Sequence, residues 1–380
     1  MKILFCANIY ENNFVGPARF AEMLLKINEW HKGEHEVRIL TADVEEEKMT
    51  IYKMNHSFPS SLRFFDVWTR GYSFYKNAKR IKKEFDFEVL IFGDSMYGLM
   101  TKYLLADKKI FIGGLINDYN FFKVRWHDIF KLKSWHYLWF HQKIEKKAAQ
   151  KLDLIFTCSH YLKNRIEQEY QVNPNKVHCL YHTCDIIKIP FNPKRLEDKH
   201  PVKILFVKHR FDIGGLEDLS KALLQLNSYQ FSISILGPSP KNEKKIVAFF
   251  ERTPHIHVNF VGTVGHEIVQ SAMQNHDILC VPSHIESLGI TNIEGLAHGI
   301  NVVTTNVGGI PEVMNHGKNG WLCQPANLKS LAKALEDCIK STVEERLKKQ
   351  QAGRKFVEEN FGEREIIIRL LHLLNTQCTA

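Results

Sequence analysis

Two segments of this sequence nearly repeat one another, MKILFCANIY at residues 1–10 and VKILFVKHRF at residues 202–211. Each begins with a short run of β-favouring apolar residues, the pattern of a strand buried on both faces of a parallel sheet. After each segment, strand-like runs alternate with amphipathic stretches of helix length, which is the order of βαβ units. The repeat therefore predicts an α/β protein with two parallel-sheet domains.

The chain length of 380 residues fits two domains of about 100–200 residues each. The strands expected in the first half are 2–8, 35–41, 87–93, 109–115, 153–158 and 176–181, and those in the second half are 202–207, 230–236, 256–261, 277–281, 301–305 and 320–323. Three prolines and a charge run in residues 187–201 indicate a linker. We predict domains at 1–190 and 202–357, a linker at 191–201, and a C-terminal helical segment at 358–380.

The charge of the chain favours anionic partners. Lys and Arg number 51 against 42 Asp and Glu, giving a formal charge of +9. Nucleic acid, an anionic lipid surface and phosphorylated small molecules are the candidates, but no nucleic-acid recognition module is visible. The sequence also lacks GxGxxG, GxxxxGK[ST] and Asp-x-Asp motifs. Arg, Lys and helix N-termini, rather than a bound metal, are therefore expected to neutralise phosphate.

Cysteine usage and hydropathy indicate the compartment. The chain has eight cysteines without a CxxC pair, which favours free thiols in a reducing environment over zinc sites or a disulfide framework. The N-terminal apolar run is shorter than a signal-peptide core, and no run approaches the ~18–20 residues of a membrane-spanning helix. We expect a cytoplasmic protein whose membrane contact, if any, is peripheral.

The stretch from Asp277 to Gly320 carries the strongest candidate site. A predicted buried strand leads through a loop with Glu286 into a helix with Glu294. At helical spacing the two carboxylates lie about 12 Å apart, so one can bind sugar hydroxyls and the other ribose hydroxyls. Between them, backbone amides approach a helix N-terminus, where the dipole favours phosphate. These amides belong to Ser287, Leu288, Gly289 and Ile290.

This stretch resembles the donor site of family 4 glycosyltransferases of the GT-B fold. The shared pattern is Pro282-Ser283, then Glu286 and Glu294, then a Gly-Gly-x-x-Glu turn at 308–312. Residues 34–37, 153–159 and 181–185 are similar to further family motifs. The resemblance implies two Rossmann-like domains facing across a cleft, with the C-terminal helix returning to the first domain.

The resemblance also implies a reaction. It is a retaining transfer of a sugar from a nucleotide-diphosphate sugar to an acceptor hydroxyl, with neither a metal nor another cofactor. Glu286 would hold hydroxyls of the donor sugar, and Glu294 would hold the two ribose hydroxyls. Arg210, at the family's Gly-Arg position, would stabilise the charge on the leaving diphosphate.

The sequence departs from the family pattern at several positions. Gly214-Gly215 replaces the usual Lys-Gly pair, so Lys208 is the compensating cation that we expect. Val15-Gly16 replaces a Gly-Gly loop, and Gly16 stays available for close approach to phosphate or acceptor. Asn117-Asp118 replaces His-Asp, which makes Asp118 a candidate acceptor base, with a turn residue as the alternative.

Residues 119–151 combine nine aromatic and eight basic residues with Asp128 and Glu145 as the acidic ones. Such interleaving suits an anionic membrane interface, and an amphipathic helix with its aromatics in the core is the alternative. A glycan or lipid-linked acceptor fits the first interpretation. Two other functions stay open, a GT-B nucleotide-sugar epimerase and a nucleotide-sugar binding protein with impaired catalysis.

Overall fold

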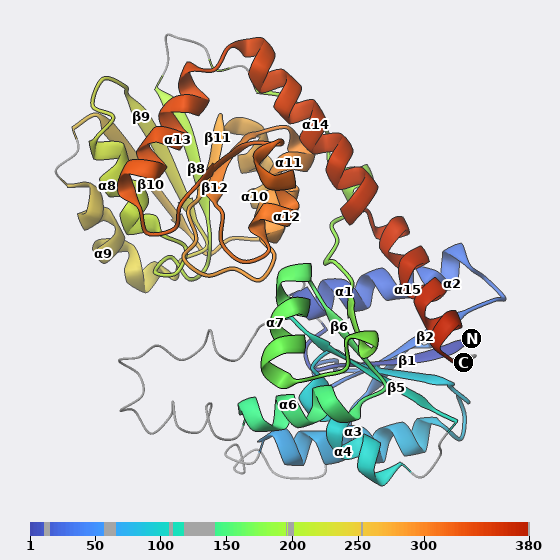
Figure 1. Ribbon diagram of the computed structural model, residues 1–380. Coiled ribbons are helices and arrows are strands. Elements are labelled where there is room, and N and C mark those ends of the chain that lie inside the picture. Colours follow the sequence, from blue (N-terminus) through green and yellow to red (C-terminus); the bar gives the residue numbers. More distant parts are fainter. Residues whose placement is uncertain are drawn as a thin grey trace. The chain divides into compact units, whose positions relative to one another are not determined.

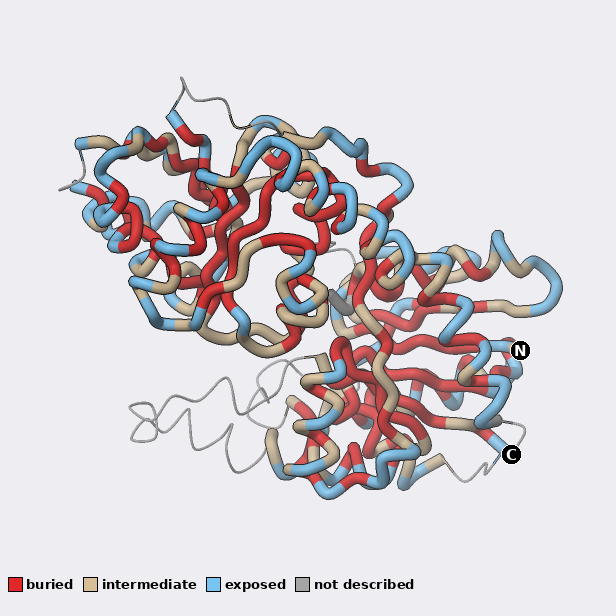
Figure 2. Tube along the Cα trace, turned by 45° about the horizontal axis from the view of Figure 1, so that its top comes forward, coloured by how far each residue is buried: buried red, intermediate tan, exposed pale blue. Residues whose placement is uncertain are grey.

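The computed structural model describes residues 1–10, 16–56, 66–105, 109–117, 141–194, 196, 201–251 and 254–378. It divides into two compact units, Met1–Thr183 with Ile366–Ala380 and Cys184–Glu365. Each unit holds one parallel sheet flanked by helices (Figure 1). Figure 2 shows most strand segments of both sheets as buried, whereas alternate residues of the edge strand at Ile256–Gly262 are exposed. The prediction of two Rossmann-like α/β domains is confirmed.

The first sheet has seven strands in the order β3-β2-β1-β4-β5-β6-β7. The order of the strands reverses at β1, because β2 and β3 lie on one side of it and β4 to β7 on the other. The carboxyl ends of β1 and β4 therefore flank the switch point, where doubly wound sheets bind ligands. The strands are β1 (Lys2–Ala7), β2 (Glu36–Thr41), β3 (Ile51–Lys53), β4 (Val89–Phe92), β5 (Phe111–Ile116), β6 (Leu154–Thr157) and β7 (Val177–Cys179).

Alternate residues of β1 serve the two faces of this sheet. Ile3, Phe5 and Ala7 join a core with helices α1 and α2 and with the last helix, α15. On the other face, Phe92 of β4 packs against Phe74 of α3. The helices of this unit are α1 (Gly16–Leu25), α2 (Ile27–Trp30), α3 (Asp66–Ile81), α4 (Ser95–Leu104), α6 (Gln142–Lys151), α7 (His160–Tyr170), η5 (Pro174–Lys176) and α15 (Glu363–Cys378).

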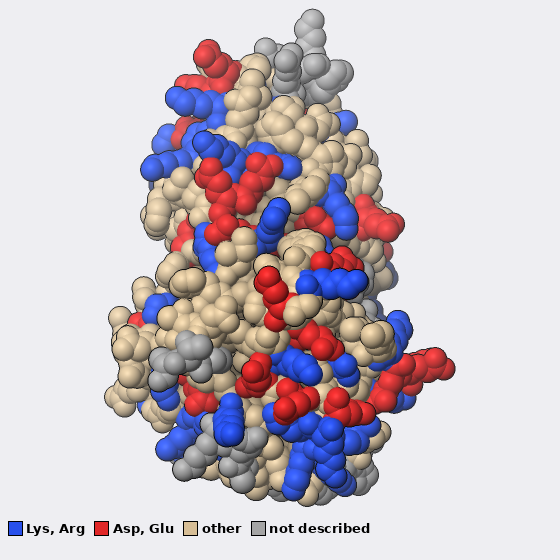
Figure 3. Space-filling view, turned by 90° about the vertical axis from the view of Figure 1, so that its right-hand side faces the viewer, with Lys and Arg blue, Asp and Glu red and all other residues tan. Residues whose placement is uncertain are grey.

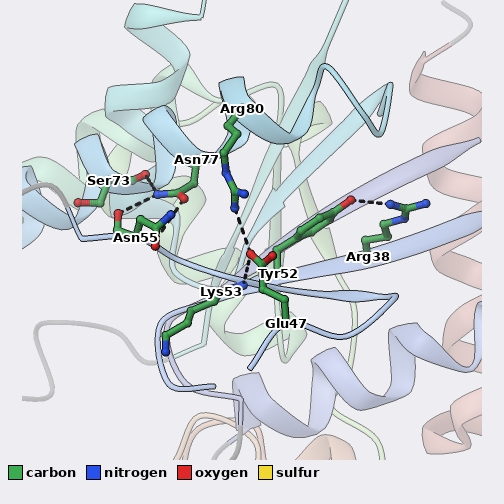
Figure 4. A network of polar contacts seen from close by, with 8 residues as sticks. All are labelled: Arg38, Glu47, Tyr52, Lys53, Asn55, Ser73, Asn77 and Arg80. Atoms are coloured by element: carbon green, nitrogen blue, oxygen red, sulfur yellow. Dashed lines mark hydrogen bonds and ion pairs between the residues drawn. The ribbon is translucent and has the colours of Figure 1, made fainter. Parts of the chain in front are cut away.

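The edge strand β3 was not predicted, because its three residues carry no pattern that marks a strand. Polar contacts hold it and the following turn (Figure 4). The buried Asn77 side chain of α3 donates to the Asn55 carbonyl at 2.9 Å and accepts from the Asn55 amide at 3.2 Å. Glu47 accepts from Lys53 N at 3.1 Å and pairs with Arg80 at 3.2 Å. Side chains thus bind the backbone at the end of β3 and just after it, Glu47 from the preceding loop at Lys53 and Asn77 from α3 at Asn55.

The second sheet has six strands in the order β10-β9-β8-β11-β12-β13, with a switch point between β8 and β11. The strands are β8 (Val202–Val207), β9 (Phe231–Leu236), β10 (Ile256–Gly262), β11 (Ile278–Val281), β12 (Asn301–Thr305) and β13 (Trp321–Cys323). The helices are η6 (Ile186–Lys188), α8 (Leu216–Leu224), η7 (Pro240–Asn242), α9 (Glu243–Val247), η8 (Ala248–Phe250), α10 (His266–Asn275), α11 (Ile290–His298), α12 (Ile310–Val313), η9 (Asn315–Gly317), α13 (Leu328–Lys340) and α14 (Val343–Phe361). All six expected strands are present.

The chain enters the second unit after Thr183, earlier than the boundary expected at residue 190. The reason is hydrogen bonding to α14. Arg354 donates to the carbonyl oxygens of Ile186 at 3.1 Å and Ile189 at 2.7 Å, and also to that of Ala297 at 2.8 Å. The chain returns to the first unit only after Glu365, beyond the end of α14, so α15 rather than all of 358–380 packs there.

Candidate functional site

The site predicted in the second half forms at the switch point between β8 and β11. Lys208 directly follows β8, and its Nζ forms an ion pair with Glu286 Oε2 in the loop after β11. The other carboxylate oxygen of Glu286 accepts from Ser287 N at 3.1 Å. The two paired side chains are 21% and 19% exposed. The structure therefore brings Lys208 and Glu286 together in a fixed arrangement that solvent still reaches.

Glycines allow the loops at this switch point to approach so closely. Gly215 has φ +74°, and a Cβ there would lie 2.2 Å from the Pro282 carbonyl oxygen. Gly308 has φ +60°, and a Cβ there would lie 1.7 Å from the Glu286 carbonyl oxygen. Any other residue would have to displace these backbones. Glu286 is thus positioned by loops that follow several strands.

The departure at Gly214 has a steric explanation. A Cβ at this position would lie 2.9 Å from Cγ of Lys208 and 2.9 Å from Cζ of Phe206. The stem of Lys208 therefore fills the space into which a lysine at 214 would extend. Here the cation that contacts Glu286 comes from the strand end.

Arg210 lies in the loop after β8, as Lys208 does, but its side chain contacts Asp212 and not Glu286. Its Nη2 is 2.8 Å from Asp212 Oδ2, and its side chain is 55% exposed. The structure thus pairs Glu286 with Lys208, and Arg210 with Asp212 of its own loop. A role for Arg210 at a diphosphate stays a prediction.

Helix α11 begins at Ile290, directly after Gly289. Gly289 has φ +94° and supplies no side-chain cap, so the first amides of α11 donate no hydrogen bond to a capping side chain. Residues 286–289 lie in the loop, so the distance of about 12 Å derived from helical spacing between Glu286 and Glu294 rests on a wrong premise. The amides of Ser287, Leu288, Gly289 and Ile290 nevertheless lead into a helix N-terminus.

Glu294 lies on α11 and is buried, with its side chain 5% exposed. His266, the first residue of α10, places Nε2 at 3.6 Å from Glu294 Oε1. Gln270 Nε2 lies 3.0 Å from the same nitrogen of His266, and Gln270 Oε1 contacts His298 Nε2. Burial, then the cations Lys194 and Arg354, lower the pKa of His298 to about 4.

Sequence reasoning missed His266, Gln270 and His298, because histidines scattered along a chain give no signal by themselves. Only the crossover from edge strand β10 through α10 to β11 brings His266 to α11. A second missed pair is Asp218 and His284, whose Oδ2 and Nε2 lie 2.7 Å apart. It joins α8 to the loop after β11.

The switch point of the first sheet is built differently. Asn8 follows β1, and its Oδ1 accepts from Arg70 Nη1 of α3. Arg70 Nη2 pairs with Asp66 Oδ1 at 2.9 Å, and the guanidinium lies 5.8 Å from the centre of the Tyr97 ring. Burial, and to a lesser degree Asp94, raises the pKa of Tyr97. This Arg70 cluster (Asn8, Asp66, Arg70 and Tyr97) was not predicted.

The structure describes only some of the other residues that we singled out in the first domain. Gly16 is the first residue of α1, and Asn117 directly follows β5. Asp118 and the aromatic residues of 119–140 lie outside the described residues. In α6 the lysines at 143, 147 and 151 are exposed while Ile144 and Ala148 are buried. Exposed lysines fit both interpretations of 119–151, and the aromatic residues that would distinguish them lie outside the described residues.

Metal and membrane features were searched in the described residues only. No cluster of three or more His, Cys, Asp or Glu with the arrangement of a metal site occurs among them. None of the described helices has the length and apolarity that crossing a bilayer requires. On the face drawn in Figure 3, Lys and Arg gather toward the lower end, with acidic side chains among them.

Both halves of the chain match family models of glycosyltransferases. Residues 188–356 match the family described as Glycosyl transferases group 1, and residues 24–187 match Glycosyltransferase Family 4. Glycogen synthase of Mycobacterium tuberculosis is 24% identical over 198 residues, which are 52% of this chain and 48% of that protein. The chain thus spans about half the length of this relative.

Two solved structures share the fold along both chains. Sucrose-phosphate synthase of Thermosynechococcus elongatus has a TM-score of 0.77 at 17% identity, covering 99% of this chain and 98% of that one. Anabaena Alr3699/HepE, solved with UDP and glucose, has a TM-score of 0.72 at 14% identity, covering 99% and 100%.

Proposed function

Because this chain belongs to the GT-B glycosyltransferases described as glycosyl transferases group 1, we propose that it moves a sugar from a nucleotide-diphosphate sugar to an acceptor hydroxyl. The transfer retains the anomeric configuration and needs no metal. The single observation that carries this proposal is Glu286, held by Lys208 beside the uncapped N-terminus of α11 at a sheet switch point. In that arrangement a carboxylate that can accept hydrogen bonds from sugar hydroxyls lies beside backbone amides that can donate to a phosphate.

The donor site has three parts in this proposal. The diphosphate binds at the α11 N-terminus, where amides and the helix dipole favour negative charge. Lys208 and Arg210 are the cations that offset the charge growing on the leaving diphosphate. Glu286 accepts hydrogen bonds from the donor sugar, and Glu294 accepts them from the ribose diol.

The chemistry then needs no protein nucleophile. The C–O bond to the diphosphate breaks while the acceptor oxygen attacks the anomeric carbon from the same face. The acceptor proton passes to the departing phosphate oxygen. Lys208 contributes most when that oxygen carries its largest charge, in the transition state.

A donor panel tests the proposal. Purified protein is incubated with common nucleotide sugars, with and without lipid extract, and release of nucleoside diphosphate is measured. Acceptor-dependent release supports transfer. An epimerase would convert the nucleotide sugar without releasing diphosphate, and a catalytically impaired binding protein would bind the donor without turning it over. Either result would replace the proposal.

We also propose that the acceptor is a glycan or a lipid-linked glycan at an anionic membrane surface, with the protein peripheral on the cytoplasmic side. The support comes from the exposed lysines of α6 and from Tyr103, which is 55% exposed and lies 5.7 Å beneath Lys147 Nζ. Each basic residue near such a surface contributes about 1 kcal/mol.

Vesicle co-sedimentation tests the membrane contact at low and high salt. Lys143→Ala with Lys147→Ala should reduce binding to anionic vesicles, while Lys333→Ala, a change on an exposed lysine of α13, should not. Binding that is absent, or unaffected by the α6 changes, points to an acceptor in solution.

A further inference from the structure

The Arg70 cluster lies at the edge of the first sheet where a ligand is expected. Asn8 directly follows β1, Asp66 is the first residue of α3, and the side chain of Asp94, after β4, caps α4. The carboxyl ends of β1 and β4 flank the switch point of this sheet, and doubly wound sheets bind ligands at such points. The proposed donor site belongs to the second sheet, so no ligand is yet assigned to this edge.

Three contacts hold the guanidinium of Arg70 and use only part of it. Nε and Nη2 donate to Asp66 Oδ1 at 3.2 and 2.9 Å, and Nη1 donates to Asn8 Oδ1. Asp66 is held in turn, because the hydroxyl of the buried Tyr97 donates to it. A guanidinium has two N–H groups on each terminal nitrogen. One N–H of Nη1 and one of Nη2 therefore have no partner among the described residues, and the side chain is 27% exposed.

The same contact orients the amide of Asn8. An arginine side chain only donates hydrogen bonds, so the Asn8 atom that faces Nη1 is the oxygen. The NH₂ group of Asn8 is therefore directed elsewhere, and in the described part of the chain it has no hydrogen-bond partner. Asn8 is also partly exposed. Asn8 and Arg70 thus present N–H donors that are already held in place and that solvent reaches.

The charges around these donors favour a neutral ligand. Arg70 is paired with Asp66, and the charge of a second carboxylate, Asp94, acts on Tyr97. A phosphate or carboxylate ligand would be repelled by both carboxylates, whereas a hydroxyl group would not. A hydroxyl oxygen accepts hydrogen bonds, and its proton can go to a carboxylate such as that of Asp66, which is 38% exposed.

We propose that Asn8 and Arg70 form an acceptor subsite that binds the hydroxyl groups of a neutral sugar. Their N–H groups donate to the hydroxyl oxygens, while Asp66 and Tyr97 keep the guanidinium in position. Because these side chains are held before the ligand arrives, little conformational entropy is lost on binding. This inference rests on the proposed function, since it needs a transferase with an acceptor, and it narrows that acceptor to a neutral glycan.

Transfer kinetics on the full chain test the inference, with the nucleotide sugar that the donor panel identifies. The neutral acceptors are the methyl glycosides of glucose, galactose, mannose and N-acetylglucosamine, and the charged ones are methyl glucuronide and glucose 6-phosphate. Arg70→Met and Asn8→Ala should each raise the acceptor KM about three- to tenfold, the effect of losing one net hydrogen bond, and leave the donor KM unchanged. Arg80→Met is the matched control, since it makes the same change near the other end of α3 and should alter neither KM.

Acceptors that lack single hydroxyls separate binding from a structural role. A deoxy glycoside without the bound hydroxyl should be a poorer acceptor for the parent, and Arg70→Met should then cause no further loss with that glycoside. If Arg70 only stabilised the fold, the substitution would lower transfer to every deoxy glycoside by the same factor.

The outcomes separate this inference from the proposed function. A parent that releases nucleoside diphosphate with lipid extract but uses none of the neutral glycosides leaves the proposed function standing and overturns the inference. An unchanged acceptor KM in both variants, or an equal loss with every deoxy glycoside, also overturns it. A parent that releases no diphosphate from any donor overturns both. Should Asn8→Ala fail to fold, Arg70→Met at the partly exposed pair decides.

Discussion

The two switch points of this molecule differ in the groups that form them, backbone in the second sheet and helix side chains in the first. In the second sheet, strand ends and loops meet closely, and glycines at 215 and 308 let backbone contact backbone around Glu286. In the first sheet, the Arg70 cluster uses side chains of α3 to reach the end of β1. A site made by backbone is rigid and intolerant of substitution, whereas a site made by helix side chains can change one residue at a time.

The largest expected effect is on turnover at the second switch point. Lys208→Ala should lower kcat by about 100-fold, as the loss of a preorganised transition-state contact does. It also leaves Glu286, 19% exposed, without its ion-pair partner. Arg210→Ala should mainly lower kcat as well, by less, because its side chain is 55% exposed. Steady-state kinetics measure both, and a larger loss for Arg210→Ala would reverse this ranking.

Gly308→Ala should have the next largest effect, on the free energy of unfolding. The left-handed backbone costs about 1–2 kcal/mol for alanine, and the contact with the Glu286 carbonyl adds about 1–3 kcal/mol. Denaturant unfolding should show a loss of about 3 kcal/mol in the free energy of unfolding. Gly265→Ala is the control, because it has φ −68° and no atom within 4 Å of the added Cβ. If both variants are equally stable, the second switch point is less rigid than we conclude.

Glu294→Ala should weaken nucleoside diphosphate binding and leave the fold intact. Loss of the charge-assisted hydrogen bonds to the two ribose hydroxyls should cost about 2 kcal/mol of binding free energy, roughly 30-fold in affinity. Calorimetry measures the affinity, with Glu243→Ala on the exposed start of α9 as control. Unchanged affinity would remove Glu294 from the site.

The smallest effect is expected at the first switch point. Arg70→Met removes a pair whose side chains are 27% and 38% exposed, so stability should change by less than about 1 kcal/mol. Nucleoside diphosphate affinity should be unchanged while transfer to an acceptor falls. Arg80→Met, on the same helix and paired with Glu47, should change neither. A loss of nucleotide affinity in Arg70→Met would contradict the separation of the two switch points.

The sequence predicted nearly all strands and the loop that carries Glu286, for local reasons. Buried parallel strands are short apolar runs, so all but β3 could be located from their residues. Glu286, Glu294 and Gly308 lie within one stretch of the chain, and their spacing is itself the signal. Lys208 was named as the compensating cation, and the structure pairs it with Glu286.

What the sequence by itself determined is therefore the set of elements and the local loops, because strand burial and glycine backbone are properties of neighbouring residues. Only the tertiary structure decided which distant residues meet. The crossover through α10 carries His266 to Glu294, and α3 carries Arg70 to Asn8. The physical reason is that crossover connections, not spacing along the chain, set these contacts.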